Sequence, residues 1–226
     1  MCGKFTQMFG WSDVVRLSDL IGRPADDRVE TATPMRFANI ITLDAEGNRV
    51  SRRMRWGLIT PSATDPNKAK LHIHARCETI ERLPTFADAF ANRRGILLTS
   101  TFNEGEEITP TKTQQYVLTP LDGQPVAIAV IWEYWASLEG AELLTFAMVT
   151  TPPNELIATI TDRMPAVLPE ADWPRWLGEE PASIDELKAM LRTSDRAFDM
   201  KKAEKKPPPP PKPKKPREPD PQPDLF

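Results

Sequence analysis

The uneven distribution of proline divides this chain into two parts with different folding capacity. Ten of the 24 prolines lie between Pro207 and Pro223, in a stretch of Lys, Pro and Glu without apolar periodicity. Such a segment buries too little apolar surface to offset the entropy of ordering it, and it favours an extended conformation. We therefore expect one folded domain over residues 1–198 and a disordered tail over residues 199–226.

The charge of the body argues against a generic nucleic-acid coat. The whole chain carries a net charge of −3, but eight basic and four acidic residues follow from Lys201 onward. The preceding part therefore holds 21 basic and 28 acidic residues, a net charge of −7. Any contact with nucleic acid must then be made by a local basic patch.

The same composition indicates a cytoplasmic protein with no membrane partner. No apolar run is long enough to cross a bilayer, and the N-terminus lacks the pattern of a signal peptide. With two cysteines in the chain, a disulfide framework is not expected, and a reducing compartment is the natural one.

Many short apolar segments and few helical ones predict an α+β domain built on a mostly antiparallel, barrel-like sheet. Asp122-Gly123 between two apolar segments predicts a β-hairpin, and Ser183 to Glu186 matches a helix capping box. The expected strands are 39–43, 52–59, 71–75, 95–102, 116–118, 126–132 and 143–150, and the expected helices begin near 12, 84, 153 and 183.

Cys2 carries the most distinctive chemistry of the chain. If Met1 is removed, Cys2 holds an α-amine with a pKa of about 7.7–8.0 and a thiol with a pKa of about 8.5 on adjacent carbons. Such a 1,2-aminothiol condenses with an aldehyde through its amine and then closes a thiazolidine ring through its thiol. The other interpretation is that position 2 merely accommodates a small residue, and Cys2 alone leaves both open.

A second polar cluster begins at His72. His72, His74 and Cys77 lie within six residues, which suggests a zinc site, but a closed site needs a fourth ligand and only Cys2 remains for it. We therefore expect no metal and no cofactor. His74 alternates with Arg76, so the two would share one face of a strand.

Glu104 follows an apolar segment and precedes a glycine. A carboxylate there is either a turn residue or a general acid–base group, and Glu106 and Glu107 are equally close in sequence. Arg163 has a guanidinium suited either to a phosphate or to Asp162.

Three apolar residues are candidates for contact with nucleic-acid bases. Pro34, Met35 and Trp56 have the side chains that wedge or stack against bases, but each also suits a core position, and their spacing does not discriminate.

Taken in order, five motifs resemble those of the SRAP family, named for SOS-response-associated peptidases. The resemblance covers about residues 2–178. The motifs are Met1–Phe5, Met54–Leu58, His74–Thr79, Phe102–Glu104 and Arg163–Leu168, followed by Trp173–Leu177.

The resemblance implies a function in DNA damage. Family members bind single-stranded DNA and trap abasic sites, whose ring-opened sugar exposes an aldehyde, as a covalent thiazolidine with the N-terminal cysteine. It implies that Cys2 is the nucleophile and that Glu104 transfers protons and takes part in removing Met1, an autoproteolytic activity of the hydrolase or lyase class. A monomer associated with the nucleoid during replication or the SOS response fits this role.

The resemblance also implies DNA contacts. Arg76 and Arg163 fall on family arginines that hold phosphates, and Lys4 stands where an arginine is common, so it keeps the charge without the bidentate geometry. Thr150 and Thr151 fall in the family's Thr-Thr stretch near the DNA backbone.

Two positions depart from the family pattern. His74 stands where the family usually has Asn, and Thr161 stands where it usually has a His that assists proton transfer. A threonine hydroxyl does not titrate near neutral pH, whereas an imidazole does. We hypothesise that His74 takes over this role; the alternative is a slower or less reversible protein.

The chain ends in Gln222-Pro223-Asp224-Leu225-Phe226. These residues resemble the bacterial sliding-clamp-binding pentapeptide, in which Leu225 and Phe226 would fill a hydrophobic pocket and Gln222 would form hydrogen bonds. The sliding clamp is thus an expected partner.

Two alternatives from other classes stay open on the sequence. One is a thiol peptidase acting on proteins, for which a Cys–His dyad is not evident. The other is a non-catalytic, clamp-associated module for single-stranded DNA in which Cys2 is incidental.

Overall fold

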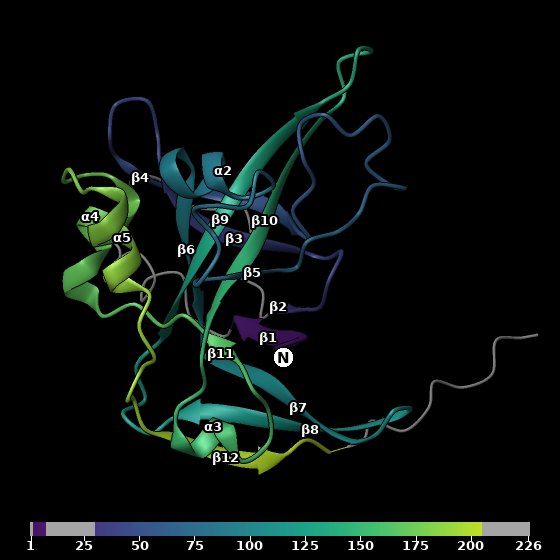
Figure 1. Ribbon diagram of the computed structural model, residues 1–226, viewed down its shortest axis with the longest axis vertical. Coiled ribbons are helices and arrows are strands. Elements are labelled where there is room, and N and C mark those ends of the chain that lie inside the picture. The colour runs from purple at the N-terminus through teal and green to yellow at the C-terminus, as the bar shows by residue number, and fades with distance from the viewer. Residues whose placement is uncertain (1, 8–29, 205–226) are drawn as a thin grey trace, which may run out of the picture.

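In the computed structural model, residues 2–7 and 30–204 are described, and they form mostly antiparallel strands with few, short helices (Figure 1). The expected α+β class is confirmed. The strands are β1 (Lys4–Gln7), β2 (Glu30–Ala32), β3 (Phe37–Leu43), β4 (Arg49–Trp56), β5 (His74–Arg76), β6 (Arg94–Thr99), β7 (Thr101–Thr109), β8 (Lys112–Pro120), β9 (Val126–Ala136), β10 (Glu142–Thr151), β11 (Met164–Pro165) and β12 (Phe198–Lys202). The helices are α2 (Ala87–Asn92), α3 (Glu155–Ala158), α4 (Trp173–Leu177) and α5 (Ile184–Met190), with a 3₁₀ turn at Glu170–Asp172.

The strands form two sheets. The smaller sheet has the order β12-β8-β7-β1-β2, and the larger one has the order β11-β10-β4-β3-β6-β9. Because β10 also pairs with β9, the path β10-β4-β3-β6-β9 closes into a ring. The β10–β4 and β10–β5 pairs are parallel.

Two apolar cores hold these layers together. One lies between the ring and the helices, where Phe90 of α2 packs near Trp176 of α4. The other contains Phe5, Trp56 and Phe146, whose rings lie 5.2 and 6.3 Å apart between centroids. This second core spans both sheets, since β1 belongs to the smaller sheet and β4 to the larger one.

The hairpin expected around Asp122-Gly123 is wrong. β8 pairs with β7 and β12, whereas β9 pairs with β6 and β10, so the chain crosses there from one sheet to the other. The reason is burial: β9 is almost continuously apolar and is covered on both faces over residues 126–131, while β8 is largely half-exposed. A local turn signal does not report this difference. The segment 95–102 likewise divides into β6 and β7, one in each sheet.

The helix ends follow their capping residues. Asn154 accepts a hydrogen bond from the backbone N–H of Ile157 and starts α3, and Ser183 and Glu186 form the expected capping box of α5.

The helix expected near residue 12 lies outside the described residues. Regular structure continues beyond residue 198, because β12 pairs with β8 as far as Lys202. Within the described ranges, no helix is both long and apolar enough to span a bilayer.

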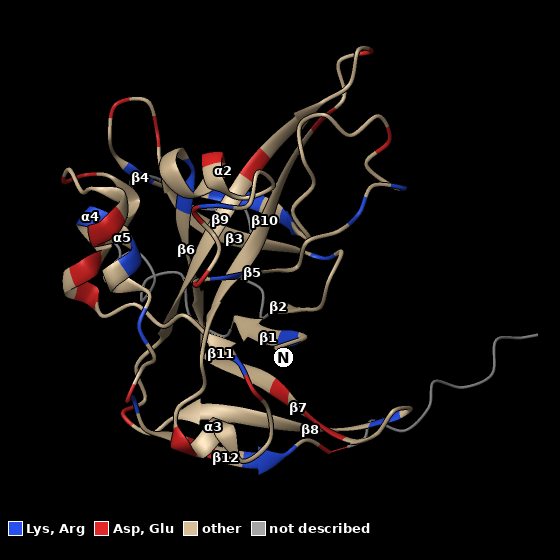
Figure 2. Ribbon diagram, in the orientation of Figure 1, with Lys and Arg blue, Asp and Glu red and all other residues tan. Residues whose placement is uncertain are grey.

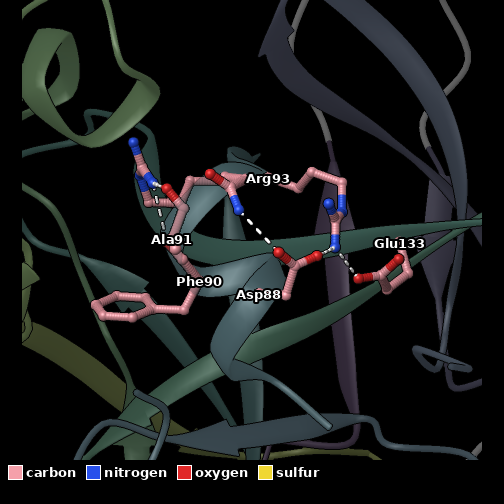
Figure 3. Close-up of polar contacts among 7 residues, drawn as sticks. Asp88, Phe90, Ala91, Arg93 and Glu133 are labelled. Atoms are coloured by element: carbon pink, nitrogen blue, oxygen red, sulfur yellow. Dashed lines mark hydrogen bonds and ion pairs between the residues drawn. The ribbon is translucent and has the colours of Figure 1, made fainter. Parts of the chain in front are cut away.

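An ion-pair cluster fixes α2 to β9 (Figure 3). The Arg93 guanidinium lies between the carboxylates of Asp88 and Glu133 and pairs with both. Glu133 is 5% exposed, and its burial raises the pKa of its carboxyl despite the opposing effect of Arg93. Asp88 is largely exposed, so its share of the cluster is screened by solvent.

Arg93→Met is expected to lower the free energy of unfolding by about 3 kcal/mol at pH 7, since removing one partner strands a buried charge. The loss should shrink as the pH falls toward the ordinary pKa of Glu, because protonated Glu133 needs no cationic partner. Urea unfolding at pH 7 and pH 5 measures both effects. Asp88→Asn is the control and should cost less than about 1 kcal/mol; an equal loss in the two variants would contradict the assignment.

Candidate active site

Cys2 lies in the core that spans the two sheets. β1 pairs with β7 in the register Lys4 to Asn103, which brings the residues before Lys4 alongside Glu104. The Cys2 side chain is 1% exposed, and its Sγ lies 3.5 Å from the carbonyl oxygen of Lys4. Burial, followed by the charge of Glu104, raises the pKa of the thiol well above its ordinary value. The thiol therefore needs a nearby base in order to act as a nucleophile.

Glu104 is that base by position. It is fully buried on β7, and burial raises the pKa of its carboxyl to about 7. The backbone amide of Cys2 opposes the rise by hydrogen bonding, and the charge of Asp162 adds to it. A carboxyl that is half-ionised near neutral pH can both donate and accept a proton, which is the property of a general acid–base group.

His74 also contacts Cys2. Its Nε2 is 2.8 Å from the carbonyl oxygen of Cys2. Because a carbonyl only accepts, Nε2 carries the proton and donates it. Burial lowers the pKa of the imidazole to about 4, against the effect of this hydrogen bond, so His74 is neutral at pH 7. Its ring meets the edge of Trp56 at 6.1 Å between centroids.

Arg163 is engaged within the protein. Its guanidinium forms a bidentate pair with Glu78, and its Nη2 also donates to the carbonyl oxygen of Thr150 at 2.7 Å. Arg163 is 7% exposed, and the hydrogen bond to it lowers the pKa of Glu78 to about 2. A phosphate at Arg163 would have to compete with this carboxylate.

The other expected phosphate contacts lie nearer the surface. Arg76 is exposed and Lys4 is half-buried, and Figure 2 shows a basic segment on β5 and another on β1, the latter beside the N-terminal end. Arg76 has no ion-pair partner among the described residues. Thr150 and Thr151 are both buried, and the Thr150 hydroxyl accepts a hydrogen bond from Arg163.

The three candidates for base contact separate in the structure. Met35 is 40% exposed and Pro34 is half-buried, whereas Trp56 is fully buried and donates from its indole N–H to the carbonyl oxygen of Ile73. Trp56 is therefore a core residue and offers no exposed stacking face.

The remaining candidates make other contacts or lie outside the described residues. His72 packs edge-on against Phe86 at 5.4 Å, and the described residues contain no group of three His, Cys, Asp or Glu side chains placed to hold a metal ion. Thr161 is half-buried, and its backbone N–H donates to Ile157. Residues 222–226 lie outside the described part.

Two site residues were not expected from the sequence in these roles. Asp162 acts on the charge of Glu104, and Glu78 neutralises Arg163. Adjacency to Arg163 was the only signal for Asp162. Glu78 lies 85 residues away from Arg163, and sequence spacing does not report that contact.

The site combines a buried cysteine, Cys2, with a glutamate whose pKa is about 7, in a two-sheet α+β fold. This combination is that of a protein whose cysteine can react with help from a neighbouring acid–base group. The chain belongs to the SRAP family: the model of the family described as SOS response associated peptidase (SRAP) matches residues 1–206. This confirms the resemblance drawn from the five motifs.

Curated relatives agree with this assignment. The chain is 30% identical over 198 residues to abasic site processing protein YoqW of Bacillus subtilis, covering 86% of this chain and 88% of that one. It is 31% identical over 199 residues to abasic site processing protein YoaM of the same organism, with 86% and 87% covered. A more distant relative is abasic site processing protein HMCES of Xenopus tropicalis, 28% identical over 163 residues and covering 61% and 49%.

Solved structures share the fold. A protein from Bacteroides thetaiotaomicron superimposes with a TM-score of 0.72 at 21% identity, covering 88% of this chain and 92% of that one. A phage-related protein from Bordetella bronchiseptica gives a TM-score of 0.71 at 19% identity, with 90% and 95% covered.

Proposed function

We propose that this protein traps abasic sites in single-stranded DNA by forming a thiazolidine between Cys2, freed of Met1, and the aldehyde of the lesion. The relatives named as abasic site processing proteins support the substrate. The observation that carries the chemistry is the contact of Cys2 with a glutamate whose pKa is about 7. The trapped lesion would be shielded from strand cleavage during replication or the SOS response.

The reaction can be balanced with Glu104 alone. The α-amine of Cys2 adds to the aldehyde carbon and gives a carbinolamine. The Glu104 carboxyl donates its proton to the departing hydroxyl, which leaves as water, and an iminium forms. The thiol then gives its proton to the Glu104 carboxylate while sulfur attacks the iminium carbon, and the electron pair of the C=N bond moves to nitrogen. Glu104 ends in its starting state.

The site fits a thiol peptidase less well. A thiol protease lowers the pKa of its cysteine by pairing it with a histidine. Here burial raises the pKa of the Cys2 thiol, and His74 contacts the Cys2 carbonyl oxygen. A hydrolytic role in removing Met1 would use water as the nucleophile at the Met1 carbonyl, with Glu104 accepting a proton from that water and protonating the departing α-amine of Cys2, and we include it in the proposal.

The test is a covalent adduct. Incubation with single-stranded DNA that carries an abasic site should produce a band of protein-linked DNA that survives a denaturing gel. The same oligonucleotide with a tetrahydrofuran analogue, which has no aldehyde, should give none. Intact mass should show that the reacting protein lacks Met1. Absence of an adduct with the aldehyde-bearing DNA would reject the proposal in favour of a non-catalytic DNA-binding module.

His74→Ala is expected to slow crosslink formation and reversal by about tenfold, a modest share of the 10²–10⁴ that general acid–base groups supply. The physical reason is loss of the N–H that holds the Cys2 carbonyl oxygen. Because burial lowers the pKa of His74 to about 4, the imidazole is a neutral donor at pH 7, and our hypothesis is that it takes over in this form from the family histidine missing at Thr161. His74→Asn is the matched control, since its amide keeps a donor but does not titrate. It should restore formation and leave reversal slow; wild-type rates for both steps in His74→Ala would reject the hypothesis.

Removal of Leu225 and Phe226 is expected to abolish binding to the bacterial sliding clamp and to leave crosslinking unchanged. These residues are the two apolar anchors of the terminal motif. Surface plasmon resonance with immobilised clamp measures the affinity, and Gln222→Ala tests the hydrogen-bonding position. Equal affinity with and without the two residues would remove the clamp from the list of partners.

A further inference from the structure

The strand that carries His74 is short and needs support from the residues around it. β5 has three residues, His74–Arg76, and lies off the main path of the larger sheet, beside β10 (Figure 1). Its pairing with β10 is parallel, and parallel pairs are slightly less stable per residue than antiparallel ones. The chain before β5 is held by two backbone hydrogen bonds between His72 and Leu58, at 2.9 and 3.0 Å. The end of β5 needs an anchor of its own.

That anchor is formed by the turn after β5 and converges on one carbonyl group. The carbonyl oxygen of Thr150 accepts a hydrogen bond from the backbone N–H of Cys77 at 2.9 Å and one from Nη2 of Arg163 at 2.7 Å. The same Nη2 lies 2.9 Å from Oε2 of Glu78, and Nη1 of Arg163 pairs with the other carboxylate oxygen. We call Glu78, Arg163 and the carbonyl group of Thr150 the β5 clamp.

The clamp depends on the charge of Glu78. Arg163 is 7% exposed, whereas the side chain of Glu78 is 45% exposed, so the pair joins a surface carboxylate to a buried guanidinium. The hydrogen bond from Arg163 lowers the pKa of Glu78 to about 2, so the carboxylate stays ionised near neutral pH. A buried cation without its counter-ion is unfavourable. Without Glu78, the guanidinium would turn toward solvent and give up its hydrogen bond to Thr150.

The clamp is close to Cys2 along the structure. Arg76 is opposite Thr150 in the β5–β10 register, so the clamp fixes the end of β5, two residues after His74. His74 in turn holds the carbonyl oxygen of Cys2 through Nε2, at 2.8 Å. A shift of β5 along β10 would therefore move the imidazole relative to the N-terminal cysteine.

We propose that Glu78 is a positioning residue for the reaction at Cys2, which acts through Arg163 and Thr150 to keep His74 against the Cys2 carbonyl oxygen. Glu78 takes no part in the proton transfers. Its effect on crosslinking rests on the proposed function, whereas its effect on the environment of His74 does not.

The imidazole of His74 reports on the clamp without DNA. In the full chain labelled with ¹⁵N-histidine, an NMR titration follows His74, and His72→Gln identifies its signal because the chain has two histidines. Burial is the largest cause of the low pKa of His74, which is about 4. Glu78→Gln should raise this pKa toward the ordinary value of about 6.5, because the ring becomes hydrated.

A second variant covers the case in which Glu78→Gln does not fold. Glu78→Asp keeps the charge that neutralises Arg163, but its shorter side chain gives up the bidentate geometry. It should give a pKa of His74 between those of the wild type and Glu78→Gln. A wild-type pKa in every folded variant of Glu78 would overturn the proposal.

Glu81→Gln is the matched control, because Glu81 lies in the same turn and pairs with Lys188 of α5. This variant removes an ion pair of the turn and leaves the clamp in place, so the pKa of His74 should stay at its wild-type value. An equal rise in Glu81→Gln would show that any loosening of the turn has this effect, and it would contradict a specific role of Glu78.

Crosslinking kinetics give the second readout. Glu78→Gln should slow the single-turnover rate at saturating abasic-site DNA by about fivefold, within the roughly tenfold loss expected for His74→Ala. It should not raise the Kd for the DNA, because it removes a negative charge from the protein. In the His74→Ala background it should have no further effect, since a residue that acts through His74 then has nothing to position.

The two readouts fail separately. A further fivefold loss in the double variant, or a raised Kd with an unchanged rate, would overturn the positioning role of Glu78. If the wild type forms no crosslink, the proposed function fails, but the NMR titration still decides whether Glu78 holds His74.

Discussion

Cys2→Ser is expected to eliminate the adduct that survives a denaturing gel. Serine keeps the α-amine and a small side chain at position 2, so Met1 removal and addition of the amine to the aldehyde remain available. Its hydroxyl stays protonated near neutral pH, whereas a cysteine in water is a few per cent thiolate at pH 7 and intrinsically very nucleophilic. Without sulfur the reaction stops at the iminium, which water reverses.

The iminium at which the Cys2→Ser reaction stops can be detected by reducing it. Cyanoborohydride reduces an iminium to a stable amine, so Cys2→Ser should yield an adduct only when the reductant is present. Cys77→Ser is the control, because Cys77 is the other free thiol of the chain and is also buried. It should crosslink as the wild type does. A stable adduct from Cys2→Ser without reductant would show that the thiazolidine is not the product.

The sequence named Cys2 as a candidate by its position and Glu104 only through the family resemblance, since Glu106 and Glu107 are equally close in sequence. The β1–β7 pairing brings Cys2 and Glu104 together. By contrast, the buried position of Trp56 follows from three aromatic rings that meet across two sheets, and no local pattern encodes that. Such contacts depend on pairings between distant strands.

The same limit explains the misplaced hairpin and the occupied arginine. A turn signal at Asp122-Gly123 is compatible with either a hairpin or a crossing between sheets, and the burial of β9 on both faces decides it. The sequence left Arg163 suited to a phosphate or to Asp162. Its partner in the structure is Glu78, which lies 85 residues away and is placed by the turn after β5, so sequence spacing does not report the pair. Sequence motifs propose candidate residues, but the ion pairs formed in the fold decide whether a charged side chain is available to a ligand.

Glu104→Gln is expected to slow crosslink formation by at least about 100-fold, the lower end of what a positioned acid–base group supplies. Glutamine has the same shape and can occupy the same buried position, but it neither protonates the departing hydroxyl nor accepts the thiol proton. Single-turnover kinetics with abasic-site DNA measure the rate. Glu107→Gln is the matched control: Glu107 lies on the same strand, is exposed, and should react at the wild-type rate.

The pH profile separates an acid–base role from a structural one. Because burial raises the pKa of Glu104 to about 7, its protonated form declines as the pH rises through 7, and the wild-type rate should fall on that side. On the acid side the rate should fall because the α-amine, with an ordinary pKa of about 7.7–8.0, becomes protonated. The wild type should therefore give a bell-shaped profile, while Glu104→Gln keeps only the limb that rises with pH. A bell of unchanged shape in Glu104→Gln would assign the alkaline limb to another group and leave Glu104 with a structural role.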